Sequence, residues 1–327
     1  MALRPRDVVV VGASAGGVEA LRVMMAELPA DLRAAVLVVL HLPSGGTSAL
    51  AGILHRAGPL PATPAQDGER LVTGHVYVAR PDHHLLVIGD RIALSHGPTE
   101  NGHRPAINAL FRSAVVSRGA AVTGVLLSGV LDDGVAGLRA IAAQGGVVVV
   151  QDPEDALYPA MPNHALAAVS ADHVVPAAGI GEVLGKITGT SVENSVSAPE
   201  LLRWENDIAG GNVPHEKVEY VGAPSEFSCP DCDGVLADIE RGQWYRCRVG
   251  HAWSAEALLA AQGSALDRAM WTALRTLEER TALSTRMAAQ AHDRGSPAIA
   301  TRYEEQARET TEAAEEIRRQ LGLGENW

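Results

Sequence analysis

The chain has 327 residues, of which 46% are apolar and only 4% aromatic, so it can bury a large core built mainly from Ala, Val and Leu. Its net charge of -12 argues against nucleic acid or an anionic membrane surface as the main partner. No stretch approaches the roughly 18 consecutive apolar residues of a membrane span, so we expect no direct membrane insertion. The N-terminus enters a strand-like run without a signal-peptide pattern, which predicts a cytoplasmic protein.

The first part of the chain, to about residue 187, alternates strand-like runs with helical patterns. Most of the runs are continuously aliphatic, which is typical of a parallel sheet covered on both faces. We therefore predict an α/β fold with a doubly wound, mainly parallel sheet. Residues 74–95 hold two runs separated by Pro-Asp-His-His, which we interpret as an antiparallel β element with His83 and His84 on a solvated turn. The runs cover residues 7–14, 34–41, 74–80, 84–95, 121–129, 145–153 and 172–176, and the helices include 18–28, 47–56, 106–117 and 134–144.

The composition changes after this alternating part. Polar and turn-forming residues dominate 188–226 and indicate a linker with one short helix near 200–208. All three cysteines follow, and the remaining residues show helical periodicity interrupted at 293–297. That periodicity predicts a helical hairpin with an apolar face formed by Leu266, Met270, Leu274 and Leu277. The predicted domains are a sheet domain at 1–187, a linker at 188–226, a cysteine module at 227–254 and a hairpin tail at 255–327.

A turn of small residues, Gly12-Ala13-Ser14-Ala15-Gly16-Gly17, follows the first aliphatic strand. A dinucleotide fingerprint would need glycine where Ser14 stands, and a P-loop would need a lysine that is missing here. The turn does fit Gly-x-Ser-x-Gly between a strand and a helix, a pattern in which small neighbours allow a strained turn and expose the serine oxygen. From the residues alone, a structural or phosphate-binding role for this turn stays open.

Two other strands of the predicted sheet end in residues that could activate a serine. His41 follows the strand at 34–40, and Asp132 and Asp133 follow the run at 121–131. A serine hydroxyl needs a base within hydrogen-bond reach and a group that orients this base. Because the carboxyl ends of parallel strands lie at one edge of a sheet, these side chains can meet there. The alternative for the histidine is a plain polar residue at a strand end.

Six segments of the chain resemble the catalytic domain of the bacterial chemotaxis (CheB-like) methylesterases, in the same order. They are VVVGASAGGVEAL, LHLPSGGTSALAGIL, VYVARPDHHLLV, HRPAINALFRSAV, LLSGVLDDGVAGLRAI and QDPEDALYPAMPNHAL, and they span residues 6 to about 187. Enzymes of this family hydrolyse glutamyl methyl esters on chemoreceptors and deamidate certain receptor glutamines. The resemblance implies that Ser14 is the nucleophile, His41 the general base and Asp133 its orienting carboxylate.

The resemblance also indicates which residues surround the triad. Asp132 stands where the family has Asn and is a possible substitute for Asp133. The oxyanion donors are expected to be backbone N–H groups near Ala15 and Val130, the latter at a position that is usually Met in the family. Asn108 replaces an aspartate of the family pattern, which changes the substrate detail and leaves the triad intact. Candidate residues of the cleft, each with an equally ordinary structural role, are His103, Arg104 and Met161.

A phosphorylatable receiver domain precedes the esterase in typical members of the family. Here the first strand begins at Asp7, so we expect no receiver of roughly 120 residues before it, since even a small domain needs about 50 residues. If this protein is regulated, we expect the control to lie elsewhere.

The three cysteines follow a metal-ligand spacing that ends in a histidine. They form Cys229-x2-Cys232 and Cys247-x3-His251, which predicts a tetrahedral Cys3His zinc site. Four protein ligands leave no open position, so the zinc is expected to be structural, and no metal is needed for catalysis. Three free buried thiols are the alternative. The nearby residues that could contact nucleic acid, although the acidic chain favours a protein contact or a folding role, are Arg246, Arg248 and Trp253.

The leading hypothesis is a serine hydrolase that demethylates glutamyl esters on a chemoreceptor-like protein. A second hypothesis keeps the triad and makes glutamine deamidation the main activity. A third is a signalling scaffold, in which the cysteine module and the helices bind a partner and esterase activity is minor. The hairpin at 255–327 could pair with the esterase domain, with a second copy or with a partner protein.

Overall fold

The computed structural model describes residues 3–41, 48–193, 197–212 and 222–323. They fall into two compact units, Met1–Leu258 and Leu259–Trp327, which are described separately below. The first unit holds the sheet domain and the cysteine module, and the second holds most of a helical hairpin.

A seven-stranded, wholly parallel sheet forms the centre of the first unit, in the order β10-β9-β8-β2-β3-β5-β4. The chain runs from β2 to β3 and β5 on one side and later returns to place β8 on the other side of β2. The strand order therefore reverses at β2, which is where open α/β sheets place their ligand sites. The strands are β2 Val8–Ala13, β3 Ala35–Leu40, β4 Ala62–Pro64, β5 Val76–Val78, β8 Val122–Leu126, β9 Val147–Gln151 and β10 His173–Val175.

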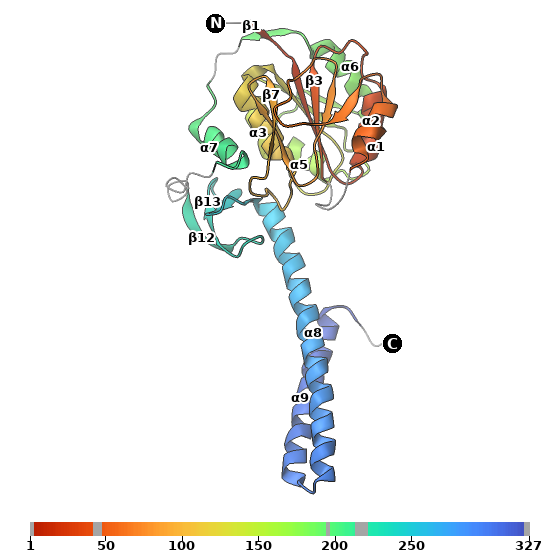
Figure 1. The fold of residues 1–327 in the computed structure, drawn as a ribbon, viewed down its shortest axis with the longest axis vertical. Coiled ribbons are helices and arrows are strands. Elements are labelled where there is room, and N and C mark those ends of the chain that lie inside the picture. The colour runs from red at the N-terminus through yellow and green to blue at the C-terminus, as the bar shows by residue number, and fades with distance from the viewer. Residues whose placement is uncertain (1–2, 42–47, 194–196, 213–221, 324–327) are drawn as a thin grey trace. The chain divides into compact units, whose positions relative to one another are not determined.

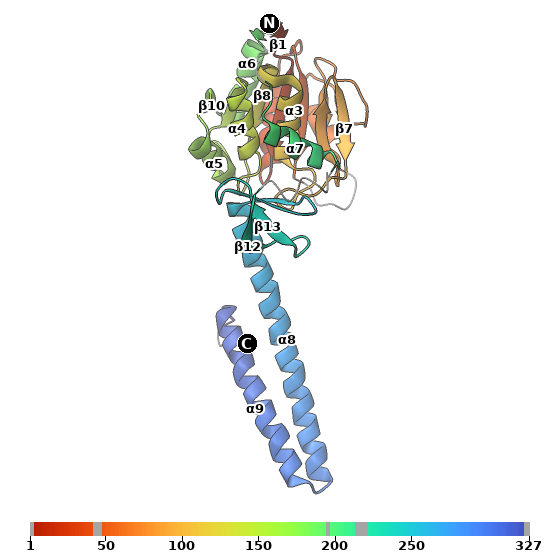
Figure 2. The same ribbon diagram turned by 90° about the vertical axis from the view of Figure 1, so that its left-hand side faces the viewer.

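Helices cover both faces of the sheet and confirm the predicted doubly wound α/β class (Figures 1 and 2). Alternate valines of β2 point to opposite faces: Val9 and Val11 join one buried cluster, and Val8 and Val10 join the other. The first cluster includes side chains of α1 Gly17–Ala26, α2 Leu50–Ala57 and α6 Ala177–Ile187, and the second includes side chains of α3 Ile107–Arg118, α4 Val135–Ala143 and α5 Ala160–Ala168.

The antiparallel element differs in detail from the prediction. Residues 76–78 belong to the parallel sheet, and the antiparallel pair is the hairpin of β6 His84–Ile88 and β7 Arg91–Ser95. The expectation that His84 is solvated was wrong, because its side chain is fully buried. Its Nε2 bonds the carbonyl of Pro98 at 2.9 Å and its Nδ1 accepts from the N–H of Ala106 at 3.2 Å. Burial lowers the pKa of His84, which favours the neutral ring that this pair of bonds requires.

The polar segment after the sheet contains one helix that is packed against the domain. A short antiparallel pair, β1 Leu3–Pro5 with β11 Ser191–Glu193, first ties the two ends of the sheet domain together. Helix α7, Glu200–Ala209, then packs on α3 and buries Trp204 and Ile208.

A four-stranded antiparallel sheet, here called the ribbon, follows α7 and completes the first unit. It spans residues 223–254 and carries the cysteines. Its strands are β12 Ala223–Ser228, β13 Val235–Asp238, β14 Trp244–Cys247 and β15 Ala252–Ser254, and α8 Ala255–Asp293 begins immediately after the last strand.

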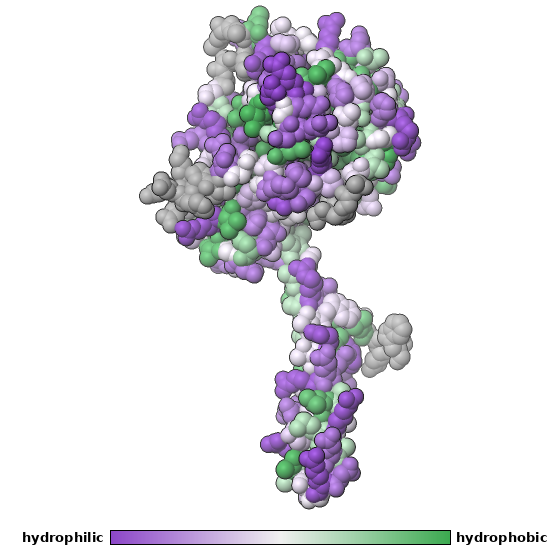
Figure 3. Space-filling view, in the orientation of Figure 1, coloured by the Kyte–Doolittle hydropathy of each residue, from purple (hydrophilic) through white to green (hydrophobic). Residues whose placement is uncertain are grey.

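The second unit pairs α8 with α9, Pro297–Gln320, through small side chains. Ala288, Ala300 and Ala314 are buried in this seam, and the hydroxyls of Thr281 and Thr310 bond at 2.7 Å. Leu266 was expected on the apolar face but is 63% exposed. Figure 3 shows the hydrophobic residues of the hairpin interspersed with hydrophilic ones, so this face of the hairpin has no continuous apolar band. Neither α8 nor any other helix in the described ranges is apolar enough over sufficient length to cross a bilayer.

Candidate active site

The serine turn lies at the carboxyl end of the central strand, between β2 and α1. Ser14 is held by its N–H, which donates to the carbonyl of Ser128 at 3.0 Å. The left-handed residue of the turn is Gly16, with φ of 70°, and not Ser14, so the strain expected at the serine lies instead at a glycine that tolerates it. A Cβ on Gly12 would lie 2.3 Å from Ile107, so the turn also requires a close approach of β2 and α3.

His41 lies between Ser14 and Asp133 and bonds both. Its Nδ1 is 3.2 Å from the Ser14 hydroxyl, and its Nε2 is 2.7 Å from a carboxylate oxygen of Asp133. The side chain of His41 is only 7% exposed and that of Asp133 3% exposed. A carboxylate at Nε2 fixes the tautomer that leaves Nδ1 as an acceptor facing the serine. The three residues reach this edge from β2, β3 and the loop after β8, as their strand-end positions predicted.

Asp133 lies in a site built to hold a carboxylate anion. Besides His41, it accepts the N–H groups of Ile107 at 2.7 Å, Asn108 at 3.2 Å and Gly134 at 3.0 Å. Burial by itself raises the pKa of Asp133, but the hydrogen bond and charge of His41 and the Ile107 N–H lower it below its usual range. The group is therefore ionised at neutral pH and can stabilise a protonated His41.

Asp132 occupies a different environment and does not contact the histidine. Its carboxylate accepts the hydroxyl of Ser254 at 2.6 Å. Burial raises the pKa of Asp132, the bond from Ser254 opposes this shift, and the neighbouring charge of Asp133 adds to it. Among the described residues, His41 bonds Asp133 alone of the two carboxylates, so the geometry gives no support to Asp132 as a substitute.

The two expected oxyanion donors lie in loops beside the serine. Neither the N–H of Ala15 nor that of Val130 has a backbone or side-chain acceptor among the described residues, so both can serve a substrate oxygen. The loop that carries Val130 also contains Leu131, a bulky residue with φ of 58°. This backbone conformation costs energy in a residue with a side chain, and such residues cluster at functional sites. The side chain of Ser128 links the loops, because its hydroxyl donates to the carbonyl of Ala15 at 2.8 Å.

The three cleft candidates have three different surroundings. The ring of His103 stacks on His41 with centroids 3.7 Å apart and planes 14° apart. Met161 is fully buried beside the serine turn, where a Cβ on Gly129 would lie 2.4 Å from its Cε. Arg104 bonds Asp82 at 2.7 Å and the carbonyls of His96 and Gly97, so its side chain supports a loop.

The geometry of the triad agrees with the match of this region to a known protein family. The model of the CheB methylesterase family matches residues 9–184, more than half of the chain. The chain belongs to this family. The crystal structure of the Thermotoga maritima CheB methylesterase catalytic domain is 31% identical in sequence and superposes with a TM-score of 0.53, covering 56% of this chain and 98% of that one.

Several CheB relatives carry a double name. Protein-glutamate methylesterase/protein-glutamine glutaminase 2 of Xanthomonas oryzae pv. oryzae is 38% identical over 180 residues, which are 54% of this chain and 50% of that protein. The protein numbered 4 under the same double name in Geobacter metallireducens is 39% identical over 170 residues, covering 51% of this chain and 49% of that protein. The chain therefore spans about half the length of the curated relatives that it matches.

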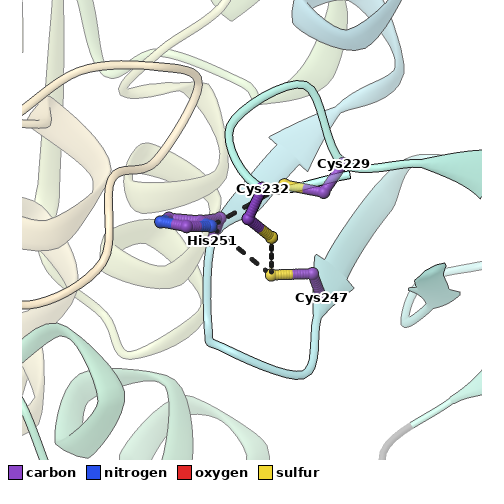
Figure 4. A group of neighbouring side chains, drawn as sticks. All are labelled: Cys229, Cys232, Cys247 and His251. Atoms are coloured by element: carbon purple, nitrogen blue, oxygen red, sulfur yellow. Dashed lines mark hydrogen bonds between the residues drawn. The ribbon is translucent and has the colours of Figure 1, made fainter. Parts of the chain in front are cut away.

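A second constellation outside the matched CheB region brings the three cysteines and His251 together (Figure 4). The four ligand atoms all lie within 4.8 Å of one another. The thiols of Cys232 and Cys247 are 3.7 Å apart, and Nδ1 of His251 is 3.5 Å from Cys247 and 3.7 Å from Cys229. A tetrahedral zinc ion with ordinary bond lengths has sulfur–sulfur edges of about 3.8 Å and sulfur–nitrogen edges of about 3.5 Å. These three separations are close to the edges of such a tetrahedron, and the group can bind a metal.

The residues considered for nucleic acid do not form a free surface. Arg246 and Trp253 are buried, at 2% and 4% exposure, and only Arg248 of the three faces solvent. The sequence reasoning missed Glu100 and Asn101, which are buried between the ribbon and the sheet domain. The Asn-Gly pair at 101–102 is a strong signal for a tight turn and could have marked this segment.

Proposed function

We propose that this chain is a serine esterase that demethylates glutamyl methyl esters on a chemoreceptor-like protein, with Ser14, His41 and Asp133 as its triad. The observation that carries the proposal is the position of the His41 ring, whose two nitrogens meet the serine hydroxyl and the buried carboxylate. The substrate class is inferred from the names of the relatives, which are protein-glutamate methylesterases.

The reaction follows from the roles that these atoms can take. The Ser14 oxygen attacks the ester carbonyl carbon while Nδ1 of His41 takes the serine proton, and the developing oxyanion accepts the N–H groups of Ala15 and Val130. The tetrahedral intermediate then expels methoxide, which leaves as methanol with the proton from His41. Water next attacks the acyl-enzyme while His41 takes a proton from it. His41 then gives this proton to the departing Ser14 oxygen, which releases the glutamate and restores the free serine. Asp133 keeps the ring oriented and stabilises its protonated form.

The same groups could hydrolyse a glutamine side chain, and we propose deamidation as a second activity. The tetrahedral intermediate would then expel ammonia with the proton held by His41, and the later steps would be the same. The double name of the relatives supports this extension.

The test uses methylated chemoreceptor fragments and measures released methanol, with mass spectrometry of the receptor peptides as a second readout. Wild-type protein is expected to release methanol, and Ser14→Ala is expected to lower the rate by about 10³-fold or more. Ser170→Ala, at an exposed serine, is the matched control and should keep the wild-type rate. Undiminished release by Ser14→Ala would overturn the triad, and conversion of glutamine without ester loss would make deamidation the main activity.

We also propose that Cys229, Cys232, Cys247 and His251 hold one structural zinc ion. Zinc would cross-link two tight loops of a module of about 30 residues, which is too small to fold on an apolar core alone. With four protein ligands it has no open position for a substrate, so its contribution is to the folding of the ribbon.

Metal analysis of the purified chain tests this second proposal. About one zinc atom per chain is expected in the wild type, and Cys232→Ser should lose it together with the slow amide exchange of residues 223–254. His173→Asn, which removes a histidine of β10 far along the chain from the cluster, should keep the metal. Wild-type protein that is free of metal and still protects these amides would refute the site.

A further inference from the structure

The ribbon and the candidate active site are joined by residues 99–103, here called the bridging loop. Its backbone pairs with β15: the N–H of Ala252 donates to the carbonyl of Thr99 at 3.1 Å, and the N–H of Asn101 donates to the carbonyl of Ala252 at 2.8 Å. The side-chain oxygen of Asn101 also accepts the N–H of Ser254 at 2.8 Å. The bridging loop is thus held along the edge strand of the ribbon, immediately after the ligand His251.

The other end of the bridging loop reaches the histidine of the triad. Asn101 and Gly102 have φ of 52° and 73°, and the backbones of Glu100 and His103 bond each other at 3.2 and 2.9 Å on either side of them. Such a two-residue turn fixes its flanking residues closely in space. The residue after this turn is His103, whose ring stacks on His41. A shift of Asn101 would therefore move the ring that covers the triad histidine.

A buried group of charges anchors the same loop to the ribbon. It consists of Glu100, Arg112, Glu205 and Arg246 and is called the buried ion cluster below. Glu100 of the bridging loop is fully buried and bonds Arg112 of α3 and, at 3.3 Å, Arg246 of β14. Two positive and two negative charges balance, and burial of a charge is tolerable only with such partners. Separation of the ribbon from the loop would leave Glu100 with one partner.

The contact between the ribbon and the sheet domain combines polar bonds with close packing, such as that of the Trp253 ring beside Gly102. A cavity of about 580 Å³ lies beside them, lined by groups from both sides, including Asp132, Arg139, Gln243 and Ser254. Because this cavity separates part of the two surfaces, hydrogen bonds beside it, such as that of Asn101, contribute to the positioning. The bond from Ser254 to Asp132 adds a second link, one residue from the triad carboxylate.

We propose that the ribbon positions the bridging loop so that His103 covers His41, and that the esterase is fully active only when the ribbon is folded around its metal. The inference rests on the proposed esterase function and adds a source of control within this chain. His103 is a positioning residue here: its ring fixes the plane of the His41 ring, on which proton transfer to and from the reacting oxygen depends. Displacement of a catalytic group by about 1 Å can lower the rate about 100-fold, so loss of this support should lower kcat.

The experiment uses the full chain and two small probes that need no receptor docking: p-nitrophenyl acetate and a fluorophosphonate that labels an activated serine. Asn101→Gly removes the side-chain acceptor and still allows the positive φ. Asn101→Asp retains an acceptor oxygen, and aspartate also tolerates a positive φ. Asn101→Gly is expected to lower kcat and the labelling rate about 10- to 100-fold with KM for the small ester changed less than about twofold. Asn101→Asp should recover most of the rate.

Metal removal provides the second arm and guards against a variant that fails to fold. Treatment of wild-type protein with a chelator should lower kcat on the same probes by a similar factor, and added zinc should restore it. Arg248→Ala, at an exposed position of the ribbon, should change neither the rate of ester hydrolysis nor the rate of fluorophosphonate labelling. Circular dichroism of each sample checks that the sheet domain stays folded.

Three outcomes are distinguishable. Wild-type protein that neither hydrolyses the ester nor reacts with the probe contradicts the esterase function itself and, with it, this inference. If untreated wild type is active, and both its metal-free form and Asn101→Gly keep the kcat of untreated wild type, the inference is overturned and the esterase function stands. Loss of activity on methylated receptor alone, with the small probes unaffected, also overturns it, because the ribbon would then bind substrate and not position His103.

Discussion

The sheet edge and the ribbon each hold a constellation of polar side chains, and they fix it by different means. At the sheet edge, Ser14, His41 and Asp133 follow strands that are buried on both faces by aliphatic side chains. In the ribbon, two short loops carry the metal ligands, and charged side chains provide much of the contact with the sheet domain. Apolar burial sets the geometry of the first site, whereas ligands and ion pairs set that of the second.

This difference predicts different sensitivities. The aliphatic sheet offers many redundant contacts, so a polar substitution at its edge should alter chemistry more than folding. The ribbon has few contacts to spare, and removal of one buried partner leaves another charge uncompensated. The variants below probe each side of this comparison with a neighbouring control residue.

The largest effect is expected at the sheet edge, from Asp133→Asn. This change keeps the shape but removes the charge that holds the histidine tautomer, so kcat/KM should fall about 10³- to 10⁴-fold. Asp132→Asn, one residue away and bonded to Ser254, should lower it less than about tenfold. Ester hydrolysis and urea unfolding, measured on both variants, separate chemistry from stability. Equal losses from the two substitutions would contradict the assignment of the orienting carboxylate to Asp133.

On the ribbon side, Arg246→Met should act on stability. Arg246 bonds Glu100 at 3.3 Å and Glu205 at 3.1 Å while almost fully buried, and loss of one partner from such a cluster costs about 3–5 kcal/mol. Burial raises the pKa of Glu205, but Arg112 and Arg246 together lower it overall, which shows how far this carboxylate depends on its cations.

Arg248→Met is the control for that variant, because Arg248 lies two residues away on the solvent side. Its free energy of unfolding should change by less than about 0.5 kcal/mol. Urea unfolding followed by tryptophan fluorescence reports the ribbon through Trp244 and Trp253, which are buried there. A stability loss of the same size in both variants would mean that the buried ion cluster contributes no more than a surface charge.

The sequence predicted most where a continuous aliphatic run ends in a polar residue. Continuous valine runs predicted the parallel sheet, and the polar residues at the ends of β2 and β3 indicated which groups would meet. The alternation of strands and helices settles which edge carries these groups, because all parallel strands place their carboxyl ends on one side.

Polar pairs between residues far apart in the chain could not be predicted from the sequence. Nothing local marks Glu100 as a partner of Arg246, since 146 positions separate them, and a charged residue in a loop is ordinarily solvated. His84 was misjudged for the same reason: its burial depends on Pro98 and Ala106, which come close only in the folded domain. The short strand β4 has only three residues, Ala62–Pro64, too few for a period-two pattern to be visible.

The smallest expected effect concerns His103, where the two regions meet. Burial, followed by the charge of His41, lowers its pKa from 6.5 to about 4, although Asp133 and Asp231 act in the opposite direction. Between these two values the unfolded chain binds a proton at His103 that the folded chain does not, so the free energy of unfolding falls as the pH is lowered from about 6.5 to about 4. The contribution is complete above pH 6.5 and is at most about 3 kcal/mol.

His103→Phe keeps an aromatic ring over His41 and removes the titrating group. Urea unfolding at pH 7 and at pH 4 should therefore show a larger loss of stability for the wild type than for the variant, by up to about 3 kcal/mol. The carboxylates around the site titrate in both proteins, so the difference between the two losses isolates His103. The same pH dependence in both proteins would mean that His103 is not held neutral against His41. The stack would then not serve as an uncharged support linking the ribbon to the sheet edge.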